Sequence, residues 1–114
     1  MDIIFSYSRK QAIDDGVLIE IENSLLKRSG IIIPTVITST LQGTIIQDDD
    51  PTIAEENLLL LLLEINHRIR QVKTDTNRIS FTKTAHNLPH KITVDIGPDD
   101  VGAPCLTIGL PEDF

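Results

Sequence analysis

The strongest constraint on the fold is a run of apolar residues that follows the segment Asp48-Asp49-Asp50-Pro51. Asp50 can cap a helix and Pro51 fits the first helical turn, while the neighbouring carboxylates complement the positive end of the helix. The pattern predicts a helix from about Pro51 to Val72. Its buried face repeats at the helical period and comprises Leu58, Leu61, Leu62, Ile65, Ile69 and Val72.

Three more leucines, Leu59, Leu60 and Leu63, lie on the flanks of this helix. A helix that is apolar over so much of its circumference is either enclosed within the fold or covered by a partner. We therefore expect these leucines to form an interface, with a homodimer as the first expectation. The uninterrupted run, Leu58–Leu63, is far shorter than the ~20 residues that span a bilayer, so no membrane segment is expected.

The last third of the chain changes to the alternating period of strands. Residues 78–83, 91–96 and 105–110 each favour a strand, and turn residues separate them at Asn87-Leu88-Pro89 and at 97–100. Three strands joined in this way predict an antiparallel meander.

The first third favours short elements. Ser8 and Gln11 have the spacing of a capping box, and Gly16 suits the left-handed position after a helix. Residues 17–21 favour a strand, and residues 22–28 favour a second short helix that ends at Gly30.

The segment after Ile31-Ile32-Ile33 is harder to assign, because isoleucines favour a strand whereas Pro34 disfavours a central one. Proline is accepted in the first turn of a helix, so we predict a helix over Thr35–Leu41. The fold class predicted for residues 1–114 is a single α+β domain. In it, one long apolar helix packs against a C-terminal three-stranded antiparallel meander, with short N-terminal helices and a strand.

Composition limits the function. The 114 residues carry a formal charge of −7 and a single cysteine, Cys105. Binding to a phosphate backbone needs clustered Lys and Arg, so nucleic-acid binding is not expected. An acidic protein that imitates nucleic acid remains a hypothesis. One cysteine permits no internal disulfide, and the first residues lack the pattern of a signal peptide, so we expect a cytoplasmic protein.

The candidate binding residues are Tyr7, Arg9 and Gln11. Arg9 could bind an anion at a helix N-terminus, although helix capping already explains Gln11. No metal site is predicted. Helix capping accounts for Asp48–Asp50, and His86 with His90 supplies only two zinc ligands.

No catalytic residue and no cofactor is predicted either, so we expect a protein that is not an enzyme. His67 lies on a polar helix face without an evident catalytic partner. Cys105 begins an apolar strand, where burial would make it inert. Asp99 and Asp100 suit a turn, and Glu112 with Asp113 is expected to form a solvated acidic tip.

Two stretches carry a resemblance. Residues 6–18 read S-Y-S-R-K-Q-A-I-D-D-G-V-L, and residues 97–113 read G-P-D-D-V-G-A-P-C-L-T-I-G-L-P-E-D. They resemble a small plasmid- and phage-borne family of unknown function. Its members carry Y-S/T-R-x-Q-A-x-x-D-G-V-L near the N-terminus and G-P-x-D-x-G-x-P-x-x-T-I-x-L-P-E-D near the C-terminus. The tryptophan-rich centre of that family has no counterpart here, because the chain contains no tryptophan.

The resemblance implies a mobile genetic element in a bacterial host cytoplasm. We therefore expect a small non-enzymatic binding protein that occupies a host protein, such as a defence factor (counter-defence). The alternatives are a binder of a small ligand such as a signalling nucleotide or a minor enzyme, both using the Arg9 region, and an acidic nucleic-acid mimic.

Overall fold

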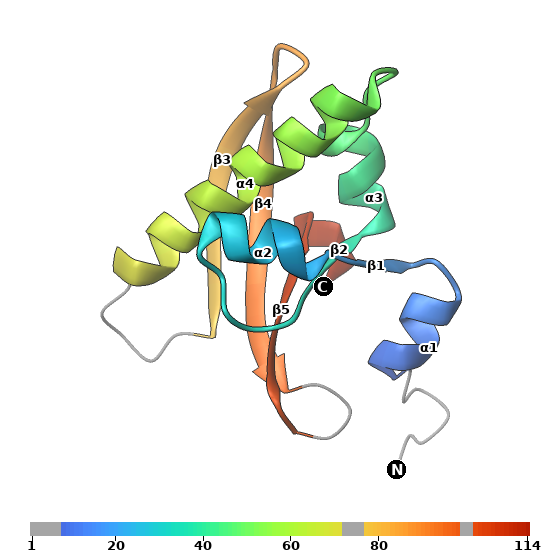
Figure 1. The fold of residues 1–114 in the computed structure, drawn as a ribbon, viewed down its shortest axis with the longest axis vertical. Helices are drawn as coiled ribbons and strands as arrows, with labels where there is room; N and C mark the ends of the chain where they lie inside the picture. Colours follow the sequence, from blue (N-terminus) through green and yellow to red (C-terminus); the bar gives the residue numbers. More distant parts are fainter. Residues whose placement is uncertain (1–7, 72–76, 99–101) are drawn as a thin grey trace.

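Helices and strands are interspersed along the chain in the computed structural model, which describes residues 8–71, 77–98 and 102–114. The elements are α1 (Arg9–Asp14), β1 (Leu18–Glu20), α2 (Asn23–Ser29), β2 (Thr35–Thr38), α3 (Ser39–Leu41), the π-helix η2 (Gln42–Ile46), α4 (Pro51–Gln71), β3 (Arg78–Ala85), β4 (Leu88–Pro98), β5 (Pro104–Gly109) and the 3-10 helix η3 (Pro111–Asp113). The predicted α+β class is confirmed: the long helix α4 lies across one face of a sheet, beside α2 (Figure 1).

The described strands form one mixed sheet in the order β1-β2-β5-β4-β3. β2 runs parallel to β5, and the other neighbouring strands are antiparallel. The predicted three-stranded meander is therefore corrected. β3, β4 and β5 are antiparallel neighbours, but they form only part of a five-stranded sheet that β2 and β1 complete. A parallel pair needs a long crossover, which here contains α4, β3 and β4, so no local turn reveals it.

The helix predicted over Thr35–Leu41 is also wrong. Its first part is strand β2, all of whose residues are buried between β1 and β5, and only the last three residues form the single turn α3. Pro34 precedes the strand and does not interrupt it, because its carbonyl accepts a hydrogen bond from the Leu106 N–H at 2.9 Å. Burial of β-branched residues in the sheet centre outweighs the helical signal of the proline.

The predicted ends of the short helices are confirmed. Ser8 and Gln11 form a reciprocal capping box at the start of α1. Gly16 (φ 78°) follows α1 and Gly30 (φ 84°) caps α2, each in the left-handed region. A side chain on Gly30 would also meet the Asn66 amide nitrogen at 2.8 Å, so α2 packs closely on α4 at this point.

Helix α4 begins at Pro51, as predicted, and the Asp50 carboxylate accepts the Thr52 N–H at 2.9 Å. The predicted last turn, with Val72, lies outside the described residues. The predicted face is inward: Leu61, Leu62 and Ile65 are fully buried, and Leu58 and Ile69 are partly buried. Among the described helices, none is long and apolar enough to cross a membrane.

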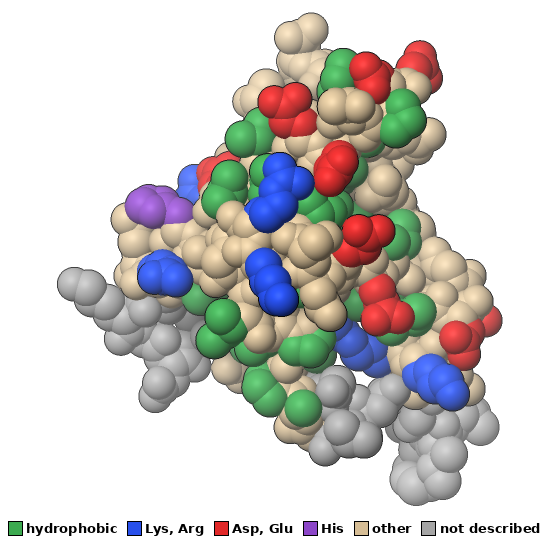
Figure 2. All heavy atoms as spheres, viewed as in Figure 1, with side chains coloured by type: hydrophobic (Ala, Val, Ile, Leu, Met, Phe, Trp, Pro, Cys, Tyr) green, Lys and Arg blue, Asp and Glu red, His purple; other side chains and the backbone are tan. Residues whose placement is uncertain are grey.

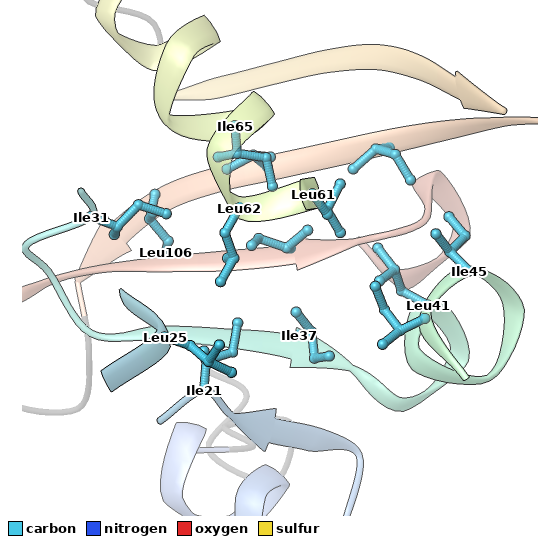
Figure 3. Close-up of a cluster of buried hydrophobic side chains, with 14 of the residues drawn as sticks. Ile21, Leu25, Ile31, Ile37, Leu41, Ile45, Leu61, Leu62, Ile65 and Leu106 are labelled. Atoms are coloured by element: carbon cyan, nitrogen blue, oxygen red, sulfur yellow. The ribbon is translucent and has the colours of Figure 1, made fainter. Parts of the chain in front are cut away.

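The core lies between α4, α2 and one face of the sheet, which we name the core face. Figure 3 shows side chains from α4, α2, β2 and β5 directed toward one another. Because strand residues alternate, the register places one residue set on this face: Ile37, Ile79, Phe81, Ile92, Val94, Leu106 and Ile108. The opposite face, which we name the second face, carries Val36, Thr38, Thr93, Asp95 and Thr107.

Candidate functional site

The Arg9 side chain joins α1 to the second face of the sheet. Its Nη1 donates to Thr107 Oγ1 at 3.2 Å, and its Nη2 donates to the Leu106 carbonyl at 3.4 Å. Both contacts are partly buried. The first turn of α1, fixed by the Ser8 cap, is what holds the Arg9 backbone in place for this reach. The N-terminal motif thus contacts the C-terminal motif directly.

The Asp113 carboxylate is the second link within this region. Its Oδ2 accepts the Thr38 hydroxyl at 2.7 Å, and the Thr40 hydroxyl contacts both carboxylate oxygens at 2.8 and 2.7 Å. The Leu110 N–H also donates to Oδ2 at 2.8 Å. The two threonine hydroxyls therefore hold η3 against the end of β2 and the start of α3, and the Leu110 N–H adds a local contact.

These donors set the charge of Asp113. Burial acts to raise the pKa of the carboxyl group, but hydrogen bonds from Thr40, from the Leu110 N–H and from Thr38 lower it. The net effect is a pKa below the ordinary value of 3.8. Hydrogen bonds to the charged form favour that form, so Asp113 is an anion at neutral pH.

A hollow of about 340 Å³ opens between these groups on the second face. We name it the terminal hollow, because residues from both terminal motifs line it. The lining comprises Ser8, Arg9, Ala12, Val17, Leu18, Thr38, Ser39, Thr40, Asp95, Thr107, Asp113 and Phe114. Hydroxyl groups, one guanidinium and carboxylates converge there, which is the pattern of a site that orients a bound group.

The rim of the terminal hollow adds apolar surface. Phe114 is exposed, and the Arg78 guanidinium lies 5.0 Å from the centre of its ring. Arg78 also donates to Asp95 Oδ1 at 3.3 Å. Val17, which follows α1 and also lines the hollow, is exposed as well. The hollow therefore combines charged groups of both signs with apolar edges, an arrangement suited to a protein segment.

The predicted binding residues separate in the structure. Arg9 lines the terminal hollow, as described above. Gln11 is exposed and its side chain accepts the Ser8 N–H at 3.1 Å, so Gln11 acts in helix capping. Tyr7 lies outside the described residues.

The predicted interface leucines also separate. Leu59 is partly buried and packs against the core, whereas Leu60 and Leu63 are exposed on α4. An interface on this helix would therefore use the last two and not the first.

The residues weighed as metal ligands lie apart. Within residues 8–71, 77–98 and 102–114, no three His, Cys, Asp or Glu side chains are grouped closely enough to hold a metal ion. Asp48 accepts the Asp50 N–H at 2.9 Å, and Asp50 caps α4, so both carboxylates serve the start of the helix. His86 occupies the tight turn between β3 and β4, with φ 53°.

The residues considered as catalytic candidates do not line the terminal hollow. His67 is exposed on α4, and Cys105 is only 3% exposed within the sheet, as expected. Asp99 and Asp100 lie outside the described residues.

Most residues that line the terminal hollow are not predicted as site residues by the sequence. The solvated acidic tip expected of Glu112 and Asp113 applies to Glu112, which is exposed, whereas Asp113 is partly buried and accepts hydrogen bonds from Thr38 and Thr40. The sequence pattern predicts a helix for Thr38 and Thr40 and a strand for Asp95, and neither pattern indicates a site. The available sequence signal for the site is that Arg9 and Asp113 each belong to one of the two motifs. A site shared by the two motifs would explain why both are present.

Comparisons of the chain with protein-family models, with curated proteins and with solved structures give no match.

Proposed function

We propose that this chain is a small non-enzymatic binding protein of a mobile genetic element, which acts by occupying a protein of its bacterial host. A defence factor is the class of partner that the resemblance favours. The binding surface in this proposal is the terminal hollow with its apolar rim.

One observation supports the proposal above the others. Both stretches that carry the resemblance contribute side chains to the same hollow: Arg9 from the first, and Thr107 and Asp113 from the second. A purely structural role would require only that each stretch fold. Here they also leave polar groups around an open space of about 340 Å³.

The state of Asp113 favours binding over catalysis. A general acid or base needs a pKa near the working pH, whereas the pKa of Asp113 is lowered by its three donors. Such a fixed carboxylate is suited to accept hydrogen bonds or to pair with a cation.

The test is a comparative capture experiment from lysate of the bacterial host, read by mass spectrometry. Ser39 is exposed and lines the terminal hollow, so Ser39→Arg should fill the hollow without removing any of its hydrogen bonds. Ser24 is exposed on α2, away from the hollow, and Ser24→Arg is the matched control.

We expect one dominant protein to be captured by the unchanged chain and by Ser24→Arg, and to be lost with Ser39→Arg. Equal capture by all three forms would place the binding surface elsewhere and contradict the assignment of the hollow.

A second candidate function uses the same hollow for a small ligand, for example a signalling nucleotide. The volume of about 340 Å³ and the convergent polar groups favour it. A thermal-shift screen over nucleotides should then raise the melting temperature of the unchanged chain and of Ser24→Arg, but not that of Ser39→Arg. No shift with any nucleotide would count against this function.

The third hypothesis, a nucleic-acid mimic, is the weakest. On the face shown in Figure 2, the carboxylate side chains are spaced apart by other surface, mostly tan, and do not form a continuous row. A mimic requires carboxylates in a continuous row at the spacing of phosphates. In one strand of a DNA duplex, successive phosphates are separated by about 3.4 Å along the helix axis.

A further inference from the structure

The outer face of α4 carries an apolar centre that nothing in the described chain covers. At 3.6 residues per turn, the residues opposite the buried side form one stripe. Its members are all exposed: Ile53, Glu56, Leu60, Leu63, His67 and Arg70. Ile53 is 43% exposed, Leu60 52% and Leu63 42%.

The charges on this stripe are divided between its ends. Glu56 lies in the N-terminal half, where Asp48–Asp50 precede the helix, and His67 and Arg70 lie in the C-terminal half. Figure 2 shows red side chains near the N-terminal end of α4, a purple one near its other end with a blue and a red one beside it, and green and blue ones between the two ends.

We propose that this stripe binds a second copy of the chain, with the two α4 helices antiparallel about a two-fold axis midway between Leu61 and Leu62. In that arrangement each Leu60 lies opposite the partner's Leu63. Each Glu56 lies opposite the partner's His67, and each Ile53 lies opposite the aliphatic stem of the partner's Arg70.

Self-complementarity is the reason for choosing a second copy over an unrelated protein. In a two-fold interface, the same patch must match itself when reversed. The stripe does so, because its apolar centre, its acidic half and its basic half are placed symmetrically about one point. Antiparallel helices also bring opposite ends of their dipoles together.

A hollow beside the stripe extends the contact. It has a volume of about 390 Å³ and lies between α4 and the β3–β4 hairpin. Its lining includes Ile53 and Leu60 of the stripe, and also Asp48, Lys83 and His86. The antiparallel arrangement directs the basic end of the partner helix toward this hollow and its Asp48 carboxylate. The added surface matters, because stable dimers bury roughly 1,200–2,000 Å² in total.

The first test is the oligomeric state across a concentration series, by sedimentation velocity. We expect a dimer for the unchanged chain. Leu60→Ser and Leu63→Ser should each weaken the dimer about tenfold or more, as expected for central apolar residues of an interface. The matched control is Ile32→Ser, since Ile32 is 96% exposed but lies outside α4. It should leave the dimer unchanged.

The second test fixes the orientation. His67→Glu alone should weaken the dimer, because the introduced carboxylate then faces the partner's Glu56. Glu56→Lys alone should weaken it as well, because it removes the acceptor that faces the partner's His67. The double variant places a lysine opposite a glutamate and should recover most of the affinity. These positions are exposed, so circular dichroism should show an unaltered fold.

A monomer at every concentration would overturn the proposal. A dimer that Ile32→Ser weakens and Leu60→Ser does not would also overturn it. Loss of the dimer with Leu60→Ser but no recovery in the charge exchange would overturn the antiparallel arrangement. None of these outcomes bears on the terminal hollow, since no stripe residue lines it.

Discussion

At the residue scale, Asp113 is the side chain on which the terminal hollow depends most. Its pKa is lowered in the folded chain, so the unfolded chain binds protons more readily. The resulting stability is complete above the unfolded value of about 3.8 and is lost as the pH falls through the lower folded value.

Asp113→Asn keeps the size of the side chain but removes its charge and one acceptor. Near neutral pH, we expect the free energy of unfolding to fall by about 1–3 kcal/mol. At about pH 3, the difference between the variant and the unchanged chain should shrink, because Asp113 of the unfolded chain is then largely protonated and its charge contributes less to the stability of the fold. Urea unfolding at both pH values measures this. A constant difference would show that the charge of Asp113 does not stabilise the fold.

Gly109 tests how closely this region is packed. A Cβ atom at position 109 would lie 2.8 Å from Thr38 Cγ2 and 3.0 Å from Asp113 Oδ2. Gly109→Ala should therefore separate these two side chains and lower the free energy of unfolding by about 1–3 kcal/mol.

The matched control is Gly97→Ala on β4. There the nearest atom, Asp95 Oδ2, would lie at 3.5 Å, which is an ordinary contact. Its expected effect is within about 0.5 kcal/mol, as for most substitutions without a clash. Equal effects at both glycines, measured by thermal unfolding, would contradict the close contact at Gly109.

Local roles could be predicted from the sequence at this scale, and distant ones could not. The cap formed by Ser8 and Gln11 joins residues three positions apart, so their spacing reveals it. The partners of Asp113 lie 75 and 73 positions away, at Thr38 and Thr40. A local sequence pattern cannot indicate contacts between residues so far apart in the chain. From the sequence, Asp113 therefore resembles an ordinary solvated carboxylate.

At the scale of elements, α4 gives the clearest difference between its two sides. Leu62 is fully buried in the core, so Leu62→Ala should lower the free energy of unfolding by about 2–5 kcal/mol. Leu60 lies on the outer face, and Leu60→Ala should cost less than about 0.5 kcal/mol in dilute protein, where the proposed dimer dissociates. Urea unfolding compares the two. A larger loss of unfolding free energy for Leu60→Ala than for Leu62→Ala would contradict the orientation of α4 described here.

The reliability of the predicted elements followed the strength of their periodicity. The apolar period of α4 extends over about four turns of sequence, and the alternation in β3 and β4 is regular, so these elements could be predicted. β2 has only four residues and follows Pro34. Its strand character comes from lying between β1 and β5, which is a tertiary effect that a short segment does not reveal.

At the scale of the whole molecule, the parallel pairing of β2 with β5 brings the ends of the chain together. It places Thr38, at the end of β2, beside η3, and it forms the surface that Arg9 contacts. The terminal hollow is therefore a product of topology. The two motifs can be recognised in the sequence, but only the strand order of the sheet shows that their side chains lie together.

The two proposed binding surfaces lie on opposite sides of the sheet. The terminal hollow opens on the second face, whereas α4 covers the core face and directs its stripe away from the sheet. A dimer through α4 would leave the terminal hollow of each copy open and would present two copies of the binding site. Such an assembly would bind a multivalent partner more tightly than a monomer does.

Hydrogen exchange measured by mass spectrometry, with and without the captured host protein, tests the central claim most directly. We predict slower exchange on binding in residues 8–18, 38–41 and 105–114 together, because all three segments line the terminal hollow. Protection confined to α4, or to only one of these segments, would contradict a shared binding site for the two ends of the chain.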